Sequence, residues 1–313
     1  MSDIEVSIII PVYNGSNYLR EAIDSALAQT YPYCEVLVIN DGSTDNGETE
    51  HIALSYGKRI RYFKKENGGV ATALNLGIQE MRGEFFSWLS HDDVYLPHKI
   101  AAQIEAVSAL PEDRRKQGIF MFAAYKTING KGKPLYEYYP DAALTRRAPF
   151  YAVFKHMING CTTLISRSLL LEAGCFRNLP TTQDYELWFR LIRLARPIYL
   201  PEVVLLSRLH AEQGFRTRKA REEAAETFTE LMQELTEEEI LACEQTREAF
   251  FAEVGGSLCE VDLKKAHDFA WSQASPTARR RYQNSFRRRL KIFLHRCGLL
   301  ALVRKLRFYA GKP

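Results

Sequence analysis

The sequence has no long apolar segment, and its cysteines do not stand at the spacings of a metal or redox site. No apolar run reaches the roughly 18 to 20 residues that a helix needs to cross a bilayer, so we expect no transmembrane helix. The N-terminus leads directly into an apolar strand, and we therefore expect no signal peptide. The six cysteines form no Cys-x-x-Cys pair and no zinc spacing, which favours reduced thiols and a cytoplasmic protein.

Two common nucleotide-binding motifs are also missing. Without Gly-x-Gly-x-x-Gly the sequence gives no support to dinucleotide binding, and without a Walker loop it gives none to a triphosphate site. There is no internal repeat and no low-complexity linker. The chain does have 313 residues, 46% of them hydrophobic. This is enough for a catalytic domain of about two hundred residues and a smaller second unit.

Apolar strands alternate with amphipathic helices over the first hundred residues. Strands are predicted over 6–10, 35–39, 60–63 and 85–89. A helix capped by Ser16 should follow the first strand, and a helix through Ala73 and Ile78 should precede the last. Such alternation predicts an α/β protein with a parallel sheet that has helices on both faces. In sheets of this kind, ligands bind beyond the carboxyl ends of the strands.

Each predicted strand ends in a polar loop, so the loops should meet in one crevice at the edge of the sheet. The last loop carries two adjacent acids, Asp92 and Asp93. Such a pair can hold Mg²⁺ or Mn²⁺, whose coordination shell is usually completed by substrate phosphates and water. For the dipeptide alone, an ordinary solvated loop is an equally good interpretation.

The order of these loops resembles the family-2 glycosyltransferases of the GT-A fold. Elements similar to the family's Pro-x-Tyr-Asn, Gln-Thr-Tyr, Asp-Asp-Gly-Ser-Thr-Asp, Asn-x-Gly and Asp-x-Asp stand at 11–14, 29–31, 40–45, 67–69 and 90–93. The resemblance covers roughly residues 4 to 215 and includes Asp184 and an Arg-x-His ending at His210. Asn40 and Ser90 depart from the family pattern, which has Asp at both positions.

The resemblance implies a GT-A-type nucleotide-sugar-binding domain over 1–215, with a mainly parallel central sheet flanked by helices. A helical C-terminal region over 216–313 would follow it. Main-chain groups of Pro11 and Val12 and the Tyr13 ring can flank a pyrimidine, and the Asp41 carboxylate can accept the imide N–H of uracil. The alternative for Tyr13 and Asp41 is that they are ordinary turn residues. The predicted nucleotide-binding residues are Pro11, Val12, Tyr13, Asn14, Asp41, Asn67, Gly68 and Asp92.

The same resemblance assigns the metal and the base. Asp93 would hold the cation across the two phosphates, where it neutralises charge on the leaving diphosphate. His210 would be a further ligand through a ring nitrogen, or else a structural histidine. Asp184 would take the proton of the acceptor hydroxyl as general base. Its alternative role is that of an acid in the first turn of a helix, where the macrodipole favours an ionised carboxyl.

Together these residues predict an inverting, metal-dependent glycosyltransferase. The donor would be a nucleotide-sugar, with a UDP-sugar fitting best, and the acceptor a hydroxyl of a glycan or lipid-linked molecule. One alternative is a nucleotidyltransferase-like enzyme, although the sequence lacks the glycine-rich, lysine-bearing loop that a triphosphate needs. The other is a non-catalytic nucleotide-sugar-binding protein, and the presence of Asp93 and Asp184 argues against it.

Charge is unevenly distributed in the C-terminal region. Residues 221–260 are acidic and helical in character, with a capping box predicted at Thr236. From Ser275 the sign reverses, and 275–309 reads as an amphipathic helix with arginines beside one apolar stripe. Such a helix suits an anionic membrane surface, at the inner face of the cell membrane. Packing on the acidic segment or on a partner is the alternative, and nucleic acid is not expected because no recognition fold accompanies the arginines.

Overall fold

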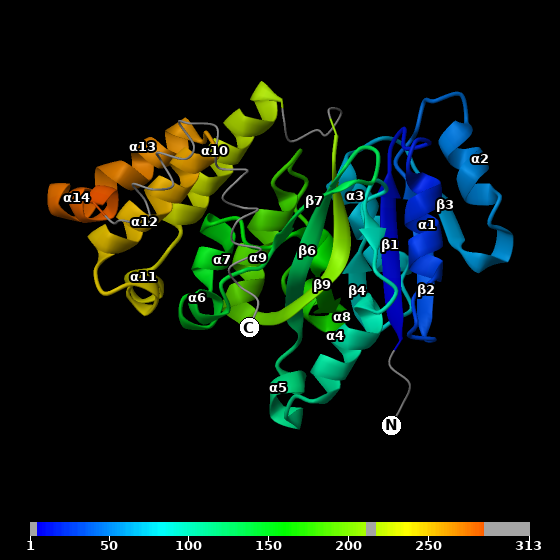
Figure 1. The fold of residues 1–313 in the computed structure, drawn as a ribbon, viewed down its shortest axis with the longest axis horizontal. Helices are drawn as coiled ribbons and strands as arrows, with labels where there is room; N and C mark the ends of the chain where they lie inside the picture. Colours follow the sequence, from blue (N-terminus) through cyan, green and yellow to red (C-terminus); the bar gives the residue numbers. More distant parts are fainter. Residues whose placement is uncertain (1–4, 211–216, 285–313) are drawn as a thin grey trace.

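The computed structural model describes residues 5–210 and 217–284. Within these residues a nine-stranded sheet has the order β3-β2-β1-β4-β8-β6-β9-β5, with β7 paired to β6 (Figure 1). The strands are β1 Val6–Val12, β2 Cys34–Asn40, β3 Arg61–Lys64, β4 Phe85–Trp88, β5 Val94–Tyr95, β6 Phe120–Asn129, β7 Pro134–Tyr138, β8 Leu164–Ser166 and β9 Ile198–Leu209. The structure confirms the α/β class and the GT-A-type arrangement that the sequence predicts.

The first half of the sheet is parallel, as the alternation of strands and helices predicts. β1 pairs with β2 and β4, and β2 pairs with β3, all in parallel. Every residue of β1 is buried, because helices cover both faces of this strand. The connecting helices are α1 Leu19–Leu27, α2 Glu48–Leu54 and α3 Val70–Glu80. The carboxyl ends of these strands, which carry the polar loops, therefore share one edge.

The second half of the sheet is mixed. β8 is antiparallel to both β4 and β6, whereas β9 runs parallel to β6 and antiparallel to β5. The two-residue strand β5, just after Asp93, thereby joins the acidic loop to β9, which ends next to His210. The helices of this half are α4 Lys99–Ser108, α5 Glu112–Lys116, α6 Ala142–Arg147, α7 Phe150–Phe154, α8 Arg167–Glu172 and α9 Gln183–Leu194.

The start of the first helix differs from the prediction. Helix α1 begins at Leu19, with Tyr18 at its N-cap position and no side-chain cap. Ser16 was predicted to be that cap, and this was wrong. Its hydroxyl instead donates a hydrogen bond to Glu48 of α2 at 3.0 Å. The Ser16 hydroxyl thus bonds to a residue of another helix and does not cap its own. The pattern within one segment of sequence cannot reveal such a partner.

The C-terminal helices form a bundle beside α7 and α9 (Figure 1). They are α10 Arg218–Gln233, α11 Glu237–Cys243, α12 Arg247–Glu260, α13 Lys264–Gln273 and α14 Pro276–Asn284. The capping box at Thr236 is confirmed, since its hydroxyl and the Glu239 side chain exchange hydrogen bonds with each other's main chain. Aromatic rings join the bundle to the sheet domain, with Phe250 stacked on Tyr151 at 5.3 Å.

Part of the predicted basic helix lies outside the described residues. Ser275 does begin a helix, since its hydroxyl accepts the Ala278 N–H, but residues 285–309 of the prediction are not described. In the described part of the chain no helix combines the length and apolar character needed to cross a membrane. The predicted division at residue 215 stays a prediction, since one continuous cluster of buried side chains includes both regions.

Candidate active site

The loops after β1 and β2 are held together by Asn14. Its main-chain N–H donates to the Ser43 hydroxyl, and its side-chain oxygen accepts the Thr44 N–H at 2.7 Å. Asn14 has a positive φ of 48°, a conformation that asparagine adopts more readily than most residues. The adjacent Tyr13 ring is 46% exposed, although large aromatic side chains are usually covered. The structure thus presents a free ring at the end of β1, next to the buried Pro11 and Val12.

Asp41 is buried at the end of β2 and organises the loop after β3. Its Oδ1 accepts hydrogen bonds from Lys65 at 2.6 Å and from the Gly68 N–H at 3.0 Å, and its Oδ2 accepts the Gly69 N–H at 2.8 Å. The Asn67 side chain donates to the main-chain oxygen of Asp41. The structure therefore brings together three of the predicted nucleotide-binding residues. In this arrangement the Asp41 carboxylate faces the loop, and its contact with uracil stays a prediction.

The acidic loop after β4 is tied to the end of β9. The Asp93 carboxylate accepts the main-chain N–H of Arg208 at 2.7 Å, and the Arg208 side chain donates to the Asp92 main-chain oxygen at 2.8 Å. Nε2 of His210 lies 2.9 Å from Oδ2 of Asp92. The structure thus places both acids and the imidazole side by side, with His210 in contact with Asp92.

The surroundings of Asp93 suit a divalent cation. This carboxyl is only 5% exposed, and burial together with the neighbouring Asp92 raises its pKa to about 8. A bound cation would offset both effects, because it stabilises the ionised form. Within 5–210 and 217–284 no three His, Cys, Asp or Glu side chains converge as a metal cluster. Mg²⁺ or Mn²⁺ would therefore take one or two ligands from this loop and fill its shell with phosphate and water oxygens.

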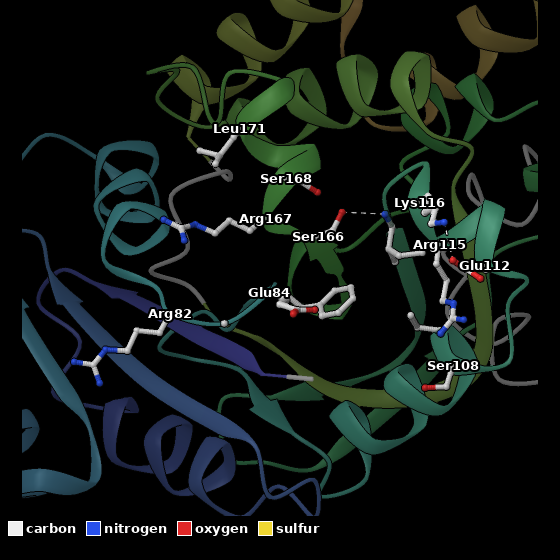
Figure 2. Close-up of a pocket in the computed structure, with 14 residues that line it drawn as sticks. Arg82, Glu84, Ser108, Glu112, Arg115, Lys116, Ser166, Arg167, Ser168 and Leu171 are labelled. Atoms are coloured by element: carbon white, nitrogen blue, oxygen red, sulfur yellow. Dashed lines mark hydrogen bonds and ion pairs between the residues drawn. The ribbon is translucent and has the colours of Figure 1, made fainter. Parts of the chain in front are cut away.

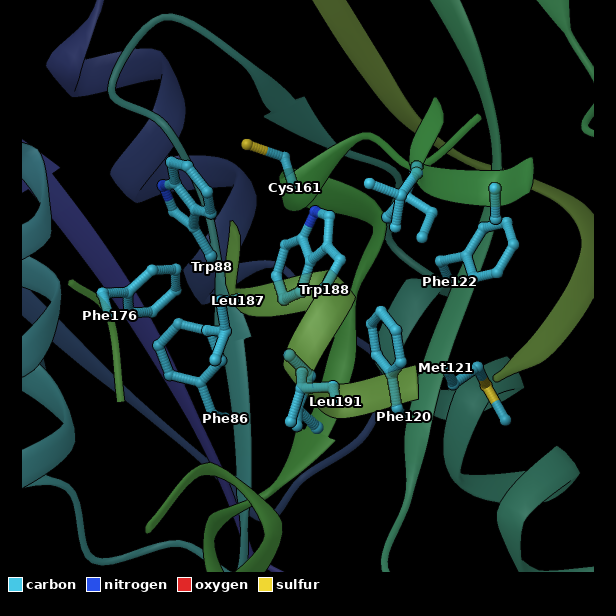
Figure 3. Close-up of a cluster of buried hydrophobic side chains, with 14 of the residues drawn as sticks. Phe86, Trp88, Phe120, Met121, Phe122, Cys161, Phe176, Leu187, Trp188 and Leu191 are labelled. Carbon is cyan, nitrogen blue, oxygen red and sulfur yellow. The ribbon is translucent and has the colours of Figure 1, made fainter. Parts of the chain in front are cut away.

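Asp184 lies in the first turn of α9, and the apolar face of this helix fixes its place. Trp188 is fully buried, and its ring stacks on Phe120 of β6 with centroids 5.2 Å apart. Phe176 meets the same ring edge-on at 6.2 Å. Figure 3 shows further members of this cluster: Phe86, Trp88, Leu187 and Leu191. Because α9 is held against the sheet by these contacts, its N-terminus stays at the rim of the crevice.

Burial makes Asp184 a stronger base than an ordinary aspartate. The pKa of this carboxyl is raised to about 7: burial raises it most, main-chain hydrogen bonds such as that from the Tyr185 N–H at 2.8 Å lower it, and the negative charge of Glu223 adds a smaller increase. A carboxylate with a pKa near neutrality is well matched to proton transfer at physiological pH. Glu186, two residues on, forms ion pairs with Arg177 and Arg190 and is therefore fully engaged in the structure of the helix.

A cavity of about 910 Å³ brings the acids of both elements together. Its lining includes Asp92 and Asp93 from the loop after β4, His210 from the end of β9, and Asp184 from α9. The 3-10 turn Gly160–Thr162 contributes to the lining, and its Gly160 leaves no room for a side chain, because a Cβ there would lie 2.5 Å from the Trp88 ring. The predicted nucleotide-binding residues other than Asp92 are not part of this lining.

The loops predicted to bind the nucleotide lie next to residues of the cavity lining. The His91 ring lines the cavity and packs closely on Gly15, where a Cβ would lie 2.4 Å from it. Val70, which follows the loop of Asn67 and Gly68, lines the cavity as well. His91 and Val70 thus connect the cavity that contains Asp184 to the loops that carry Tyr13 and Asn67.

A second cavity, of about 740 Å³, opens at the opposite edge of the sheet, near the amino-terminal ends of β4 and β6. Figure 2 shows that its arginines, Arg82, Arg115 and Arg167, point in different directions instead of toward one centre. The lining also includes Glu84 and Glu112, and none of the predicted site residues. The candidate active site is therefore the cavity at the carboxyl edge.

Sequence reasoning missed two residues at the site. Lys65 was not singled out, although it pairs with Asp41. Glu223, in α10, contacts the loop before Asp184. These partners come from elements distant in the sequence, so no local spacing could have identified them. Lys65 alone had a usable signal, because it is a cation directly beside the Asn-x-Gly loop.

The chain has clear relatives in sequence. The profile described as glycosyl transferase family 2 matches residues 7–170. A protein of Rickettsia felis described as an uncharacterized glycosyltransferase is 46% identical over 276 residues. The match covers 86% of this chain and 45% of the relative, so the chain spans less than half the length of that protein.

Solved structures share the fold. S. aureus TarS in complex with UDP-GlcNAc superposes with a TM-score of 0.62 at 18% identity, covering 86% of this chain and 78% of the other. The mannosyltransferase PcManGT of Pyrobaculum calidifontis, in complex with GDP-Man and Mn²⁺, gives a TM-score of 0.56 at 17% identity, covering 96% and 87%. At these identities the likeness establishes the fold alone.

Proposed function

Because the chain belongs to glycosyl transferase family 2, we propose that it transfers a sugar from a UDP-sugar to a hydroxyl group of a glycan or lipid-linked acceptor. The transfer inverts the anomeric centre and uses Mg²⁺ or Mn²⁺. The observation that carries this proposal is that Asp92, Asp93, His210 and Asp184 line one cavity. Transfer from a donor diphosphate to an acceptor hydroxyl needs a cation site and a base within one such cavity.

The donor end is the group of loops around Tyr13 and Asp41. The exposed Tyr13 ring offers a flat surface to the base, and the ordered 67–69 loop offers main-chain groups. Lys65 lies against Asp41 and adds positive charge near this loop. The UDP-GlcNAc bound to TarS supports a uridine donor, whereas the GDP-Man bound to PcManGT makes a guanosine donor the competing possibility.

Asp93, with Asp92 and His210, would hold the cation, which supplies positive charge to the leaving diphosphate. The chain's own part is to bury Asp93 and to hold its carboxylate through the Arg208 main chain, while His210 contacts the Asp92 carboxylate. These contacts keep both carboxyl groups in place before substrates arrive, so that little reorganisation is needed during the reaction.

Asp184 completes the chemistry at the acceptor. The acceptor oxygen attacks the anomeric carbon, the bond from this carbon to the diphosphate oxygen breaks, and the hydroxyl proton passes to Asp184. With a pKa raised to about 7 by burial, Asp184 is a better proton acceptor than an exposed aspartate and is still ionised above that pH. A correctly placed general base accelerates such a step by about a hundred- to ten-thousand-fold.

The basic segment 275–309 would attach the enzyme to an anionic membrane surface. Its sequence carries arginines in groups at 279–281 and 287–289 beside Phe286 and Phe293. This arrangement would bring the cavity near acceptors that are carried by lipids. The proposal rests on the sequence of this segment, most of which lies outside the described residues.

A donor panel tests the proposal. The full chain is incubated with Mn²⁺ and UDP-, GDP-, CDP- or dTDP-sugars, and mass spectrometry detects the released nucleoside diphosphate with water or an alkyl glycoside as acceptor. We expect release from a UDP-sugar and loss of that release in Asp184→Asn. Release from a GDP-sugar alone would change the donor, and release of pyrophosphate from a nucleoside triphosphate would replace the proposal by nucleotidyl transfer. Nucleotide binding without any turnover would identify a binding protein instead.

A further inference from the structure

The C-terminal bundle contacts the loop that precedes Asp184, through Glu223 of α10. We propose that Glu223 of α10 is a positioning residue for Asp184, and that the C-terminal helices are thereby a working part of the acceptor side of the active site. This inference rests on the proposed role of Asp184 as general base and adds a residue to it.

A single carboxylate holds two consecutive residues of the loop. Oε1 of Glu223 accepts the main-chain N–H of Thr181 at 3.1 Å and of Thr182 at 3.3 Å, and also the Thr182 hydroxyl at 2.9 Å. Oε2 accepts the Thr181 hydroxyl at 2.6 Å. Hydrogen bonds to an ionised acceptor are stronger than those between neutral groups. The four bonds fix the loop two residues before Asp184.

The start of α9 depends on this contact in an unusual way. Thr182 is at the N-cap position of α9, yet its side chain makes no cap within the helix. A threonine at this position normally accepts a hydrogen bond from the first turn. Here its hydroxyl faces α10, where it contacts Glu223 and the Thr227 hydroxyl at 2.9 Å. The place of the α9 terminus is thus set by another helix, and the Glu223 charge also stabilises the positive end of the α9 dipole.

The same helices enclose the space in front of Asp184. Ala220, Ala224 and Phe228 of α10 line the cavity together with Leu263, which immediately precedes α13. The Phe228 ring lies 5.3 Å from the Tyr185 ring, next to Asp184, so α10 packs directly on the first turn of α9. The wall that meets an acceptor therefore comes in part from the C-terminal bundle, while the donor loops come from the sheet domain.

The charge of Glu223 also reaches Asp184. It disfavours the ionised form of Asp184 and so helps to raise the pKa of that carboxyl. Removal of the charge should lower the pKa of Asp184. Because the ionised base is the active form, the acid limb of the rate profile should move to lower pH. A residue that only stabilised the fold would leave this limb where it is.

The test compares Glu223→Gln with Glu222→Gln. Glutamine keeps the size of the side chain but loses the charge and cannot accept with its NH₂ group. Glu222 is the adjacent residue, pairs with Arg218 at the surface, and is outside the cavity lining, so it is a matched control. Both are assayed by nucleoside diphosphate release from the donor that the panel identifies, across pH, and for UDP binding by calorimetry.

We expect Glu223→Gln to lower kcat by about ten- to a hundredfold, as small displacements of a catalytic group do. UDP affinity should stay unchanged, because the donor loops are in another part of the chain, and the acid limb should shift to lower pH. The control should match the parent in all three. If Glu223→Gln keeps the parent's kcat and acid limb, the inference is wrong.

A second variant keeps the test decisive if Glu223→Gln unfolds, which thermal melting would reveal. Thr181→Val removes only the 2.6 Å bond to Oε2. It should lower kcat several-fold without moving the acid limb, since the Glu223 charge stays in place. Parent-like activity of Thr181→Val in that event would overturn the inference. Asp184→Asn distinguishes failure of the positioning role of Glu223 from failure of the base role of Asp184. If Asp184→Asn is inactive while the Glu223 and Thr181 variants match the parent, only the positioning role is wrong. If Asp184→Asn is itself active, the proposed base is wrong.

Discussion

Asp93 and Asp184 share one property and differ in their surroundings. Burial raises the pKa of both carboxyl groups, to about 8 and about 7. Asp93 has a second acid and an imidazole as neighbours in the cavity lining, a set suited to a cation. Asp184 lines the same cavity from α9, and the charge that reaches it is that of Glu223. Two acids in different environments can thus take two roles in one reaction.

The first prediction concerns the pH dependence of transfer. If Asp184 is the base, kcat/KM should rise with pH through about 7, because its pKa is raised to that value and only the ionised form accepts a proton. Above about pH 7, Asp184→Asn should lose about two to four orders of magnitude in rate while UDP affinity stays constant, and the difference should shrink at lower pH, where Asp184 of the parent is protonated. The exposed acid Asp268 provides the control, as Asp268→Asn. A rate of Asp184→Asn within threefold of the parent would exclude the role.

The second prediction concerns the cation. EDTA should abolish transfer, and Mn²⁺ should restore it. Asp93→Asn is the sharper variant here, because its amide oxygen can still accept the Arg208 N–H while the charge is lost. In the presence of UDP, Mn²⁺ should raise the melting temperature of the parent but not that of Asp93→Asn. His210→Ala should weaken the Mn²⁺ response less severely. An equal Mn²⁺ response in Asp93→Asn would contradict the assignment of Asp93.

The sequence could predict the acids of the site but not their support. Asp93 and Asp184 stand in recognisable motifs, at a strand end and at a helix start, and local patterns reveal such places. Glu223 is 42 positions from Thr181, and its contact exists only because α10 packs on α9. Asp41 also has partners that its motif does not predict. Its motif predicts contact with a base, whereas its observed partners are a lysine and the main chain of a distant loop.

At the level of elements, the apolar runs were sufficient to place the first four strands, with β3 displaced by one residue to Arg61–Lys64. The short strand β5 was not predicted, because two residues carry no periodicity and their pairing to β9 is tertiary. Ser16 failed as a cap for the same reason, since Glu48 competes for its hydroxyl. Long apolar segments are therefore predictable, and their ends are decided by partners elsewhere.

The third prediction concerns Lys99 of α4. This residue connects α4 with β4 and with Thr163, directly after the 3-10 turn Gly160–Thr162. Lys99 is fully buried, and Nζ donates to Ser87 at 2.8 Å, to Gln103 at 2.8 Å and to the Thr163 oxygen at 3.2 Å. Burial lowers its pKa from 10.5 to about 7. Between these values the unfolded chain binds more protons, so the contribution of this lysine to folding stability becomes more favourable as pH rises from about 7 to 10.5.

Lys99→Met removes this titration. The free energy of unfolding of the parent, minus that of Lys99→Met, should therefore increase with pH across the window, by at most about 1.4 kcal/mol per pH unit. Urea unfolding at several pH values measures it, and the other titrating groups cancel in the difference. Lys116→Met is the control, because this lysine is exposed and pairs with Glu112 in the same helix. A difference independent of pH would show that Lys99 is not titrating in this window.

At the level of the whole molecule, the sheet domain and the C-terminal bundle share one apolar interior. Phe154 meets Phe228 of α10 and Phe250 of α12 at about 6 Å, so the bundle is packed on the domain by aromatic rings. Some acids of 221–260 are already neutralised by ion pairs with the sheet domain, such as Glu239 with Arg193 and Glu253 with Lys155. The alternative in which the basic segment packs on this acidic region must therefore compete with these existing ion pairs.

The last prediction concerns the membrane and depends on salt. In α14, Arg280 and Arg281 are exposed while Tyr282 is buried 5.8 Å from the Trp271 ring, so the start of the basic segment is anchored with its cations outward. Each arginine near an anionic leaflet contributes about 1 kcal/mol, and the attraction decays within about 10 Å at 0.1 M salt. The full chain should sediment with phosphatidylserine vesicles at low salt and be partly released near about 1 M salt.

Two variants separate the charge from the apolar stripe in that experiment. Replacement of Arg287, Arg288 and Arg289 by glutamine should remove most of the binding at low salt. Replacement of Phe286 and Phe293 by alanine should leave binding at low salt but make it fully labile to salt, because apolar insertion is the part that salt does not screen. Phosphatidylcholine vesicles are the neutral control. If the full chain ignores anionic vesicles at low salt, the basic segment serves a protein interface, and its binding partner is to be sought first in the acidic 221–260 region.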